Sequence, residues 1–134
     1  VKGAKVYAFE PSIENAKYLE KTRELNKNIE IVRKGLGDIA GFFHLANNKV
    51  NSLIYKITEK SENSETIEVT TIDEFVNEYN INRVDFIKAD IEGYERYMLA
   101  GAKETLKRFA PKLAICTYHL QDDPDVLSRI ILQE

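Results

Sequence analysis

The stretch VDFIKADIEG, residues 84–93, decides the fold that we predict. Its apolar first part, Val84 to Ala89, is typical of a buried strand, and the turn Asp90-Ile91-Glu92-Gly93 ends that strand. Apolar residues then recur at helical spacing between residues 94 and 109. The following segment, Lys112–Tyr118, is a nearly continuous apolar run of the kind found in parallel sheets. The whole stretch therefore predicts a strand, a helix and a second strand.

The same order opens the chain. The run Lys5–Phe9 is rich in β-branched and aromatic residues and predicts a strand that ends at Glu10. Pro11 cannot continue a central strand, and Ser12 is a suitable N-cap for a helix that ends near Asn26. A second short strand is predicted at Ile29–Val32. The N-terminal region therefore predicts another strand–helix–strand unit.

Between these two regions the pattern changes. Residues 39–70 contain strand-like runs at Gly41–Leu45, Leu53–Ile57 and Ile67–Val69, and polar turns such as Ser61–Ser64 separate them. Short strands joined by polar turns favour antiparallel pairing. We therefore expect a small antiparallel excursion here.

Two further helices carry clear start signals. Thr71 and Glu74 have the spacing of a capping box, and apolar residues follow at helical intervals up to Tyr79. Asp123 and Pro124 are suited to the N-cap and the first turn of a last helix. Strands that alternate with helices need crossover connections, so we predict one α/β domain over residues 1–134, built on an open, mostly parallel sheet with helices on both faces.

Composition limits the function. The chain has 134 residues, 43% of them hydrophobic, and its 19 basic and 22 acidic residues give a net charge of -3. This charge argues against a nucleic-acid binder, and no apolar run approaches the ~20 residues of a membrane span. The single cysteine, Cys116, fits a reducing compartment. We therefore expect a soluble, cytoplasmic protein with neither a nucleic-acid nor a membrane partner.

In open α/β sheets, ligands bind beyond the carboxyl ends of the strands, so the residues just after each strand are the candidates for chemistry. Glu10 follows the first strand, and its carboxylate is suited to accept two hydrogen bonds from a ribose diol. A solvated turn carboxylate explains it equally well. Asp38 is suited to accept a hydrogen bond from an adenine amino group, although a turn-forming aspartate is the simpler interpretation.

The densest group of charges is Lys88-Ala89-Asp90-Ile91-Glu92-Gly93. Lys88 and Asp90 share one face of an extended strand, a placement that allows them to pair. Asp90, Glu92 and Glu95 repel one another unless a cation, a proton or donor hydrogen bonds compensate. We therefore favour a functional interpretation over a merely solvated surface.

His119 ends the strand Lys112–Tyr118. If that strand lies beside Val84–Ala89, as consecutive crossover strands usually do, His119 and Asp90 occupy neighbouring positions at one rim. A histidine titrates near neutral pH and can take a proton from a hydroxyl, with a carboxylate orienting its ring. A strand-end histidine satisfied by backbone groups is the alternative.

These segments together resemble the FkbM-type methyltransferase family. The likeness rests on AFEP at 8–11, TTIDEF at 70–75, FIKADIEGYE at 86–95, LAGA at 99–102, and Pro111 leading to TYH at 117–119. The resemblance implies a Rossmann-like class I methyltransferase fold that uses S-adenosylmethionine to methylate a hydroxyl of a sugar or natural product. It also implies that the cofactor is bound by Glu10 at its ribose, by Asp38 near its adenine, and by Asp90.

One departure from the family pattern concerns the cofactor. The resemblance implies a Gly-rich turn upstream of the EP strand and further strands after the last helix, and residues 1–134 contain neither. We therefore expect an incomplete domain that is inactive alone. Two other functions stay open: a nicotinamide-dependent oxidoreductase, in which Glu10 again meets a ribose, and a non-catalytic α/β binding module.

Methyl transfer to an alcohol requires alignment of donor and acceptor and removal of the hydroxyl proton. We expect His119 or Asp90 to take that proton, while Glu92 and Lys88 hold the acceptor or the local structure. This mechanism requires no metal. A divalent ion held by Asp90 and Glu92 is a second route, because hard oxygen ligands suit magnesium and calcium.

Overall fold

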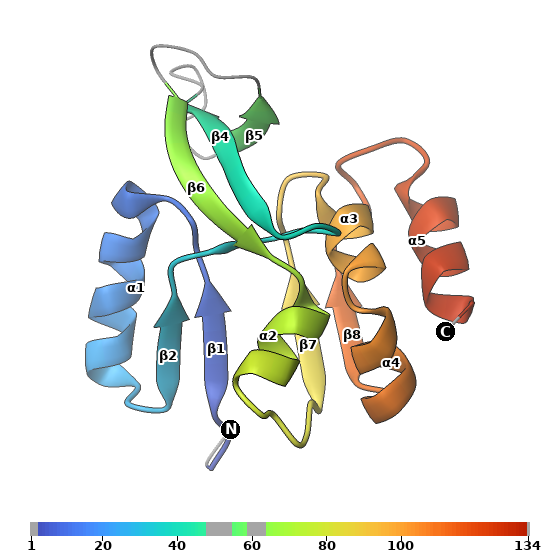
Figure 1. Ribbon diagram of the computed structural model, residues 1–134, viewed down its shortest axis with the longest axis horizontal. Coiled ribbons are helices and arrows are strands. Elements are labelled where there is room, and N and C mark those ends of the chain that lie inside the picture. The colour runs from blue at the N-terminus through green and yellow to red at the C-terminus, as the bar shows by residue number, and fades with distance from the viewer. Residues whose placement is uncertain (1–2, 48–54, 59–63, 134) are drawn as a thin grey trace. The chain divides into compact units, whose positions relative to one another are not determined.

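The computed structural model describes residues 3–47, 55–58 and 64–133 (Figure 1). The chain divides into two compact units. The first comprises residues 1–35 and 41–69, and the second comprises residues 36–40 and 70–134. The expectation of a single domain stays a prediction.

The first unit begins with a strand–helix–strand motif, as the sequence predicts. Strand β1 (Val6–Phe9) pairs in parallel with β2 (Ile29–Val32), and helix α1 (Ile13–Leu25) connects them. The buried Ser12 is the N-cap of α1, and its hydroxyl accepts a hydrogen bond from the backbone N–H of Asn15 at 3.4 Å. The cap supplies an acceptor for an N–H group that has no partner within the helix.

The region of the expected antiparallel excursion is part of a four-stranded sheet, in which residues 41–46 pair antiparallel with residues 64–69 and residues 44–47 with residues 55–58. Its strands are arranged in the order β3-β6-β4-β5, with bounds β3 (Gly35–Leu36), β4 (Gly41–Asn47), β5 (Tyr55–Thr58) and β6 (Ser64–Thr70). Alternate residues of β4 and β6 bury a small apolar cluster of Leu45, Ile67 and Val69. The start of the strand predicted at Leu53–Ile57 and most of the turn predicted at Ser61–Ser64 lie outside the described residues.

The second unit carries the elements predicted from VDFIKADIEG onward. In chain order they are α2 (Ile72–Glu78), β7 (Phe86–Ala89), α3 (Glu95–Ala100), α4 (Lys103–Phe109), β8 (Lys112–Ile115) and α5 (Asp123–Leu132). Strands β7 and β8 pair in parallel, with Phe86 opposite Lys112 and Ala89 opposite Ile115. Both strands are shorter than predicted. Strand β7 begins later, at Phe86, and still ends at Ala89 directly before Asp90, whereas β8 ends earlier, at Ile115, so that His119 lies in the loop that follows it.

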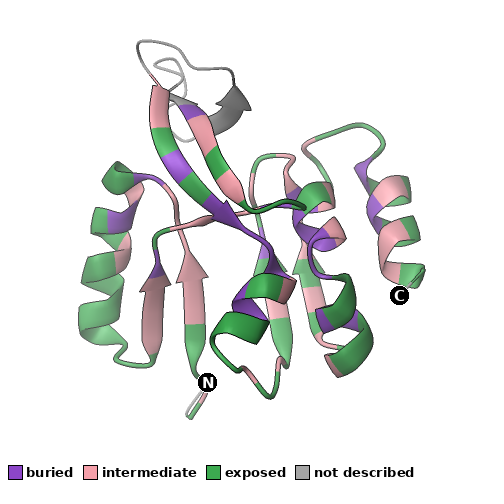
Figure 2. Cartoon of the chain, in the orientation of Figure 1, coloured by how far each residue is buried: buried purple, intermediate pink, exposed green. Residues whose placement is uncertain are grey.

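The core of the second unit consists of apolar side chains from its helices and from β7. The buried members are Ile72, Val76, Ala89, Met98, Leu99, Ala102, Leu106 and Leu127 (Figure 2). Burial of each large aliphatic side chain contributes about 1.5–3 kcal/mol. This core fixes the ends of the elements from which the candidate site is built.

One helix prediction needs correction. The helical stripe between residues 94 and 109 is two helices, α3 and α4, with Gly101 and Ala102 between them. The Asp73 carboxylate accepts the backbone N–H groups of Glu104 and Thr105 at 3.0 and 2.8 Å, and these bonds start a new helix. Apolar spacing alone does not show this break, because the stripe continues through it.

Two start signals are also refined by the structure. The Thr71 hydroxyl accepts the N–H of Glu74 at 3.0 Å, as a capping box requires, but the Glu74 carboxylate accepts the Thr70 hydroxyl at 3.5 Å. Asp122, and not Asp123, is the N-cap of α5. Asp123 is buried and its carboxylate accepts the backbone N–H of Leu120.

The α/β class is confirmed, whereas a single open sheet is not. Among the described residues the strands form three sheets. Two of them, β1-β2 and β7-β8, are parallel pairs, and in the third β4 pairs antiparallel with β5 and β6. Among the described residues, no helix is long and apolar enough to cross a membrane.

Candidate active site

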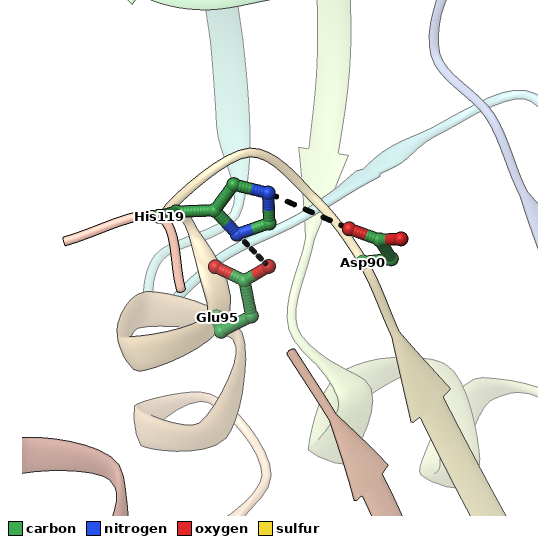
Figure 3. Close-up of side chains that lie close together, drawn as sticks. All are labelled: Asp90, Glu95 and His119. Atoms are coloured by element: carbon green, nitrogen blue, oxygen red, sulfur yellow. Dashed lines mark ion pairs between the residues drawn. The ribbon is translucent and has the colours of Figure 1, made fainter. Parts of the chain in front are cut away.

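The second unit gathers one imidazole and three carboxylates at the carboxyl ends of β7 and β8. Nε2 of His119 lies 3.5 Å from Oδ1 of Asp90 and 3.6 Å from Oε2 of Glu92. On the other side of the ring, Nδ1 lies 3.2 Å from Oε1 of Glu95 (Figure 3). The imidazole is therefore placed between carboxylates on both of its nitrogens.

The turn after β7 gives this arrangement its shape. Glu92 and Gly93 both have left-handed backbone conformations, with φ of 58° and 93°. A left-handed conformation is unfavourable for a glutamate, and glycine adopts it without a steric cost. The turn reverses the chain between Asp90 and Glu95, so that both carboxylates reach the same imidazole.

Glu95 is the most unusual member of the cluster, because its side chain has 0% of its surface exposed. Its Oε1 accepts the backbone N–H of Ile91 at 2.8 Å. Its Oε2 is buried and has no hydrogen-bond partner among the described residues. Burial of an ionised carboxylate is costly unless it is paired and hydrogen-bonded, so this position calls for a compensating charge.

Tyr118 supports Asp90 from the β8 side. Its hydroxyl donates a hydrogen bond to Oδ1 of Asp90 at 3.0 Å, and its ring lies against His119 with 4.4 Å between ring centres. Hydrogen bonds with the Cys116 side chain and with Asp90 raise the pKa of the Tyr118 phenol above its ordinary value. The TYH motif therefore contributes two adjacent side chains to the cluster.

The loop that carries His119 is anchored by charges that the sequence analysis did not identify. The Arg96 guanidinium donates hydrogen bonds to Asp122 at 2.7 Å and to the buried Asp123 at 2.6 Å. Asp123 also accepts the backbone N–H of Leu120 at 2.8 Å. The hydrogen bond to Asp122, and to a smaller extent that to Asp123, raises the pKa of the Arg96 guanidinium above its ordinary value. Glu95 therefore contacts His119 within the cluster, and the adjacent Arg96 anchors the loop that carries His119.

The pairing of Lys88 with Asp90 that strand alternation allows is not found. Lys88 lies exposed on β7, and in the part of the chain that the structure describes its ammonium forms no ion pair with a carboxylate. The reason is that Asp90 turns toward Tyr118 and His119 after the strand ends. The roles assigned to Lys88, Asp90, Glu92 and His119 stay predictions.

The residues predicted to hold the cofactor lie in different units. Glu10 belongs to the first unit, where its Oε1 accepts the N–H of Ser12 at 2.9 Å. Burial raises the pKa of the Glu10 carboxyl above 4.5, although the Ser12 hydrogen bond opposes this shift. Asp38 lies exposed in the second unit. Burial, and after it the negative charge of Asp38, raises the pKa of the Tyr94 phenol. A shared rim for Glu10, Asp90 and His119 stays a prediction.

No curated protein matches the chain significantly. Its structure is similar to the crystal structure of Methyltransferase FkbM from Methylobacillus flagellatus KT, with a TM-score of 0.71 and 25% sequence identity. That match covers 96% of this chain and 30% of the other. A family model described as Methyltransferase FkbM domain matches residues 1–132. The chain therefore belongs to the FkbM methyltransferase domain family, as the sequence resemblance predicted.

Proposed function

We propose that the protein is an S-adenosylmethionine-dependent O-methyltransferase that methylates a hydroxyl of a sugar or natural-product acceptor. The observation that carries this proposal is the placement of His119 among the carboxylates of Asp90, Glu92 and Glu95. In an α/β fold this is the edge of the sheet at which ligands bind. Membership of the family supplies the reaction type.

The cluster is suited to remove a proton from an alcohol. Asp90 and Glu92 have 40% and 36% of their side-chain surface exposed, so the Nε2 side of His119 is accessible to an acceptor. The Nδ1 side is closed by the buried Glu95. A hydroxyl that approaches Asp90 and Nε2 would therefore give its proton to His119 or to Asp90. The position of Glu92 suits it to hold the acceptor.

Glu10 fits the ribose of the cofactor. A carboxylate only accepts hydrogen bonds, and the Ser12 N–H uses part of the accepting capacity of one oxygen. A hydrogen bond with the Asn15 side chain uses a further part of this capacity. The lone pairs that are left are proposed to accept the two adjacent ribose hydroxyls. Asp38 is exposed and is suited to accept a hydrogen bond from an adenine amino group. Asp90 is also proposed to contact the cofactor. When bound, S-adenosylmethionine supplies a methyl group on a positively charged sulfur.

A reaction with a labelled methyl donor tests the proposal. The full-length protein is incubated with methyl-labelled S-adenosylmethionine and a deproteinised small-molecule extract of the source cells, and labelled products are separated and characterised. The proposal predicts label in methyl ethers, which resist mild alkali, and a large loss of label with Asp90→Asn. Label confined to nitrogen, sulfur or carboxyl groups would contradict O-methylation.

The chain spans 30% of the length of the FkbM methyltransferase structure that it resembles. The inactivity of residues 1–134 alone, which the sequence resemblance implies, is part of the proposal. We also place the reaction in the cytoplasm, which the single cysteine, Cys116, supports.

A further inference from the structure

The structure assigns a divalent-cation site to Asp90, Glu95 and His119, with Glu92 at its open side. The sequence suggested Asp90 and Glu92 as ligands for an optional ion. The geometry instead selects a mixed set of two carboxylates and one imidazole. The assignment rests on the spacing of the ligand atoms, on the balance of charge, and on a buried carboxylate oxygen without a partner.

The spacing of the three residues suits a single ion. One ligand atom from each of Asp90, Glu95 and His119 lies within 4.8 Å of the others. Ligand atoms at about 2.0–2.3 Å from one cation lie at most about 4.6 Å apart when they are on opposite sides of it. Figure 3 shows Glu95 facing Nδ1 of His119 and Asp90 facing Nε2, so an ion bound at one ring nitrogen requires the carboxylate at the other nitrogen to turn toward it.

The charge of the cluster is unbalanced without an ion. Three carboxylates surround the imidazole of His119, and a protonated imidazole offsets only one of them. Within the described residues 64–133, no lysine or arginine forms an ion pair with Asp90, Glu92 or Glu95. Like charges in close contact raise the free energy of the folded state unless a cation or a proton compensates. A divalent ion supplies the missing positive charge.

Glu95 provides evidence for a bound ion that is independent of the spacing and the charge. Its side chain is fully buried, and its Oε2 has no hydrogen-bond partner among the described residues. Nδ1 of His119 is likewise buried without a hydrogen bond, although it lies 3.2 Å from Glu95. Buried polar atoms in folded proteins nearly always have a hydrogen-bond partner, an ordered water or a bound ion. A bound cation would satisfy the atoms of Glu95 and His119 that have no partner within the protein.

The ligands are held by further contacts of the kind that orient metal ligands. The Ile91 N–H fixes Oε1 of Glu95, and the Tyr118 hydroxyl fixes Oδ1 of Asp90. The Arg96–Asp123 pair anchors the loop of His119. Such outer contacts set ligand orientation and affinity. A donor set of one imidazole nitrogen and two carboxylate oxygens favours a first-row transition-metal ion such as Mn²⁺ over Ca²⁺.

Titration with Mn²⁺ tests the site without using methyl transfer. The full-length protein is freed of metal with a chelator, and the electron paramagnetic resonance signal of free Mn²⁺ is followed as protein is added. We expect one Mn²⁺ bound per chain. Glu95→Gln, His119→Ala and Asp90→Asn should each weaken binding at least about tenfold, because each removes or neutralises a ligand. Glu104→Gln, which changes an exposed carboxylate of the same unit, should bind as the wild type does.

The choice of variants distinguishes loss of metal binding from loss of the folded structure. Asp90 has 40% of its side chain exposed, so Asp90→Asn is expected to keep the fold, and circular dichroism melting curves verify this for every variant. Absence of bound Mn²⁺ in the wild type, or wild-type affinity in folded Asp90→Asn and Glu95→Gln, would overturn the site. Mn²⁺ binding without methyl transfer would retain the site and remove the proposed function, so the two proposals fail separately.

Discussion

Nδ1 of His119 lies 3.2 Å from Oε1 of Glu95, a carboxylate that is completely buried. This contact closes one side of the imidazole and leaves the other side facing Asp90 and Glu92, which are partly exposed. The reactive side of the cluster is therefore defined by the burial of Glu95.

Substitution of His119 should abolish most methyl transfer and spare cofactor binding. His119→Asn removes a proton-accepting or ion-binding nitrogen, and general acid–base groups typically contribute about 100-fold or more to rate. We expect kcat to fall by about that factor while the dissociation constant for S-adenosylhomocysteine changes less than about twofold. Steady-state kinetics and calorimetry measure the two quantities.

His44→Asn is the matched control, because it makes the same change at a histidine of the first unit that contacts the Thr66 hydroxyl at 3.3 Å. Its kcat should equal that of the wild type. Equal kcat values for His119→Asn and the wild type would exclude His119 from the reaction.

Glu10→Gln should weaken cofactor binding and change the pH dependence of stability. Loss of charge-assisted hydrogen bonds to the ribose is expected to lower affinity about tenfold. Burial raises the pKa of Glu10 above 4.5, so the charged carboxylate costs stability at pH values above that raised pKa. The cost disappears as the pH falls below 4.5, because the carboxyl is then protonated in both the folded and the unfolded state.

Glutamine has no charge to desolvate and can still accept the Ser12 N–H. Glu10→Gln should therefore be at least as stable as the wild type at pH 7, with a difference that shrinks toward pH 4. Urea unfolding at both pH values measures it. If the free energy of unfolding of Glu10→Gln is lower than that of the wild type by the same amount at pH 7 and at pH 4, burial is not the cause of the raised pKa of Glu10.

Asp123→Ala should destabilise the second unit. It removes the acceptor for the Leu120 N–H and leaves the partly buried Arg96 with the exposed Asp122 alone. An unpaired buried group costs about 1–3 kcal/mol, so we expect the free energy of unfolding to fall by about 2 kcal/mol. Asp125→Ala changes an exposed carboxylate of the same helix and should cost less than about 1 kcal/mol. Equal losses in the two variants would show that the Asp123 contacts carry little energy.

Gly101→Ala should be strongly destabilising. A Cβ at this position would overlap the carbonyl oxygen of Gly37, which is backbone and cannot rotate away. Overpacking of a close contact typically costs about 1–3 kcal/mol. Gly41→Ala is the control, because its Cβ would meet the Phe43 ring at an ordinary 3.5 Å. Chemical unfolding should separate the two variants clearly, and similar stability for both would contradict the observed packing at Gly101.

The elements were predictable where a local pattern determines them. The Ser12 cap of α1, the Thr71 cap of α2 and the alternation in β4 and β6 depend on neighbouring residues alone. The break at Gly101 was not predictable from apolar spacing, since it depends on Asp73, which is distant in sequence.

The candidate site was predictable in part. The proximity of His119 and Asp90 follows from the parallel pairing of β7 and β8, which consecutive crossover strands favour. The approach of Glu95 depends on the left-handed turn at Glu92 and Gly93, and the anchoring by Arg96 depends on tertiary contacts. The pairing that strand alternation allows for Lys88 does not form, because that alternation does not extend beyond the end of β7.

Calorimetric titration of the full-length protein with S-adenosylhomocysteine, and separately with NAD⁺, distinguishes a methyltransferase from a nicotinamide-dependent oxidoreductase. We expect one S-adenosylhomocysteine bound per chain with micromolar affinity and no heat from NAD⁺. Binding of NAD⁺ in place of S-adenosylhomocysteine, or binding of neither, would contradict the proposed function.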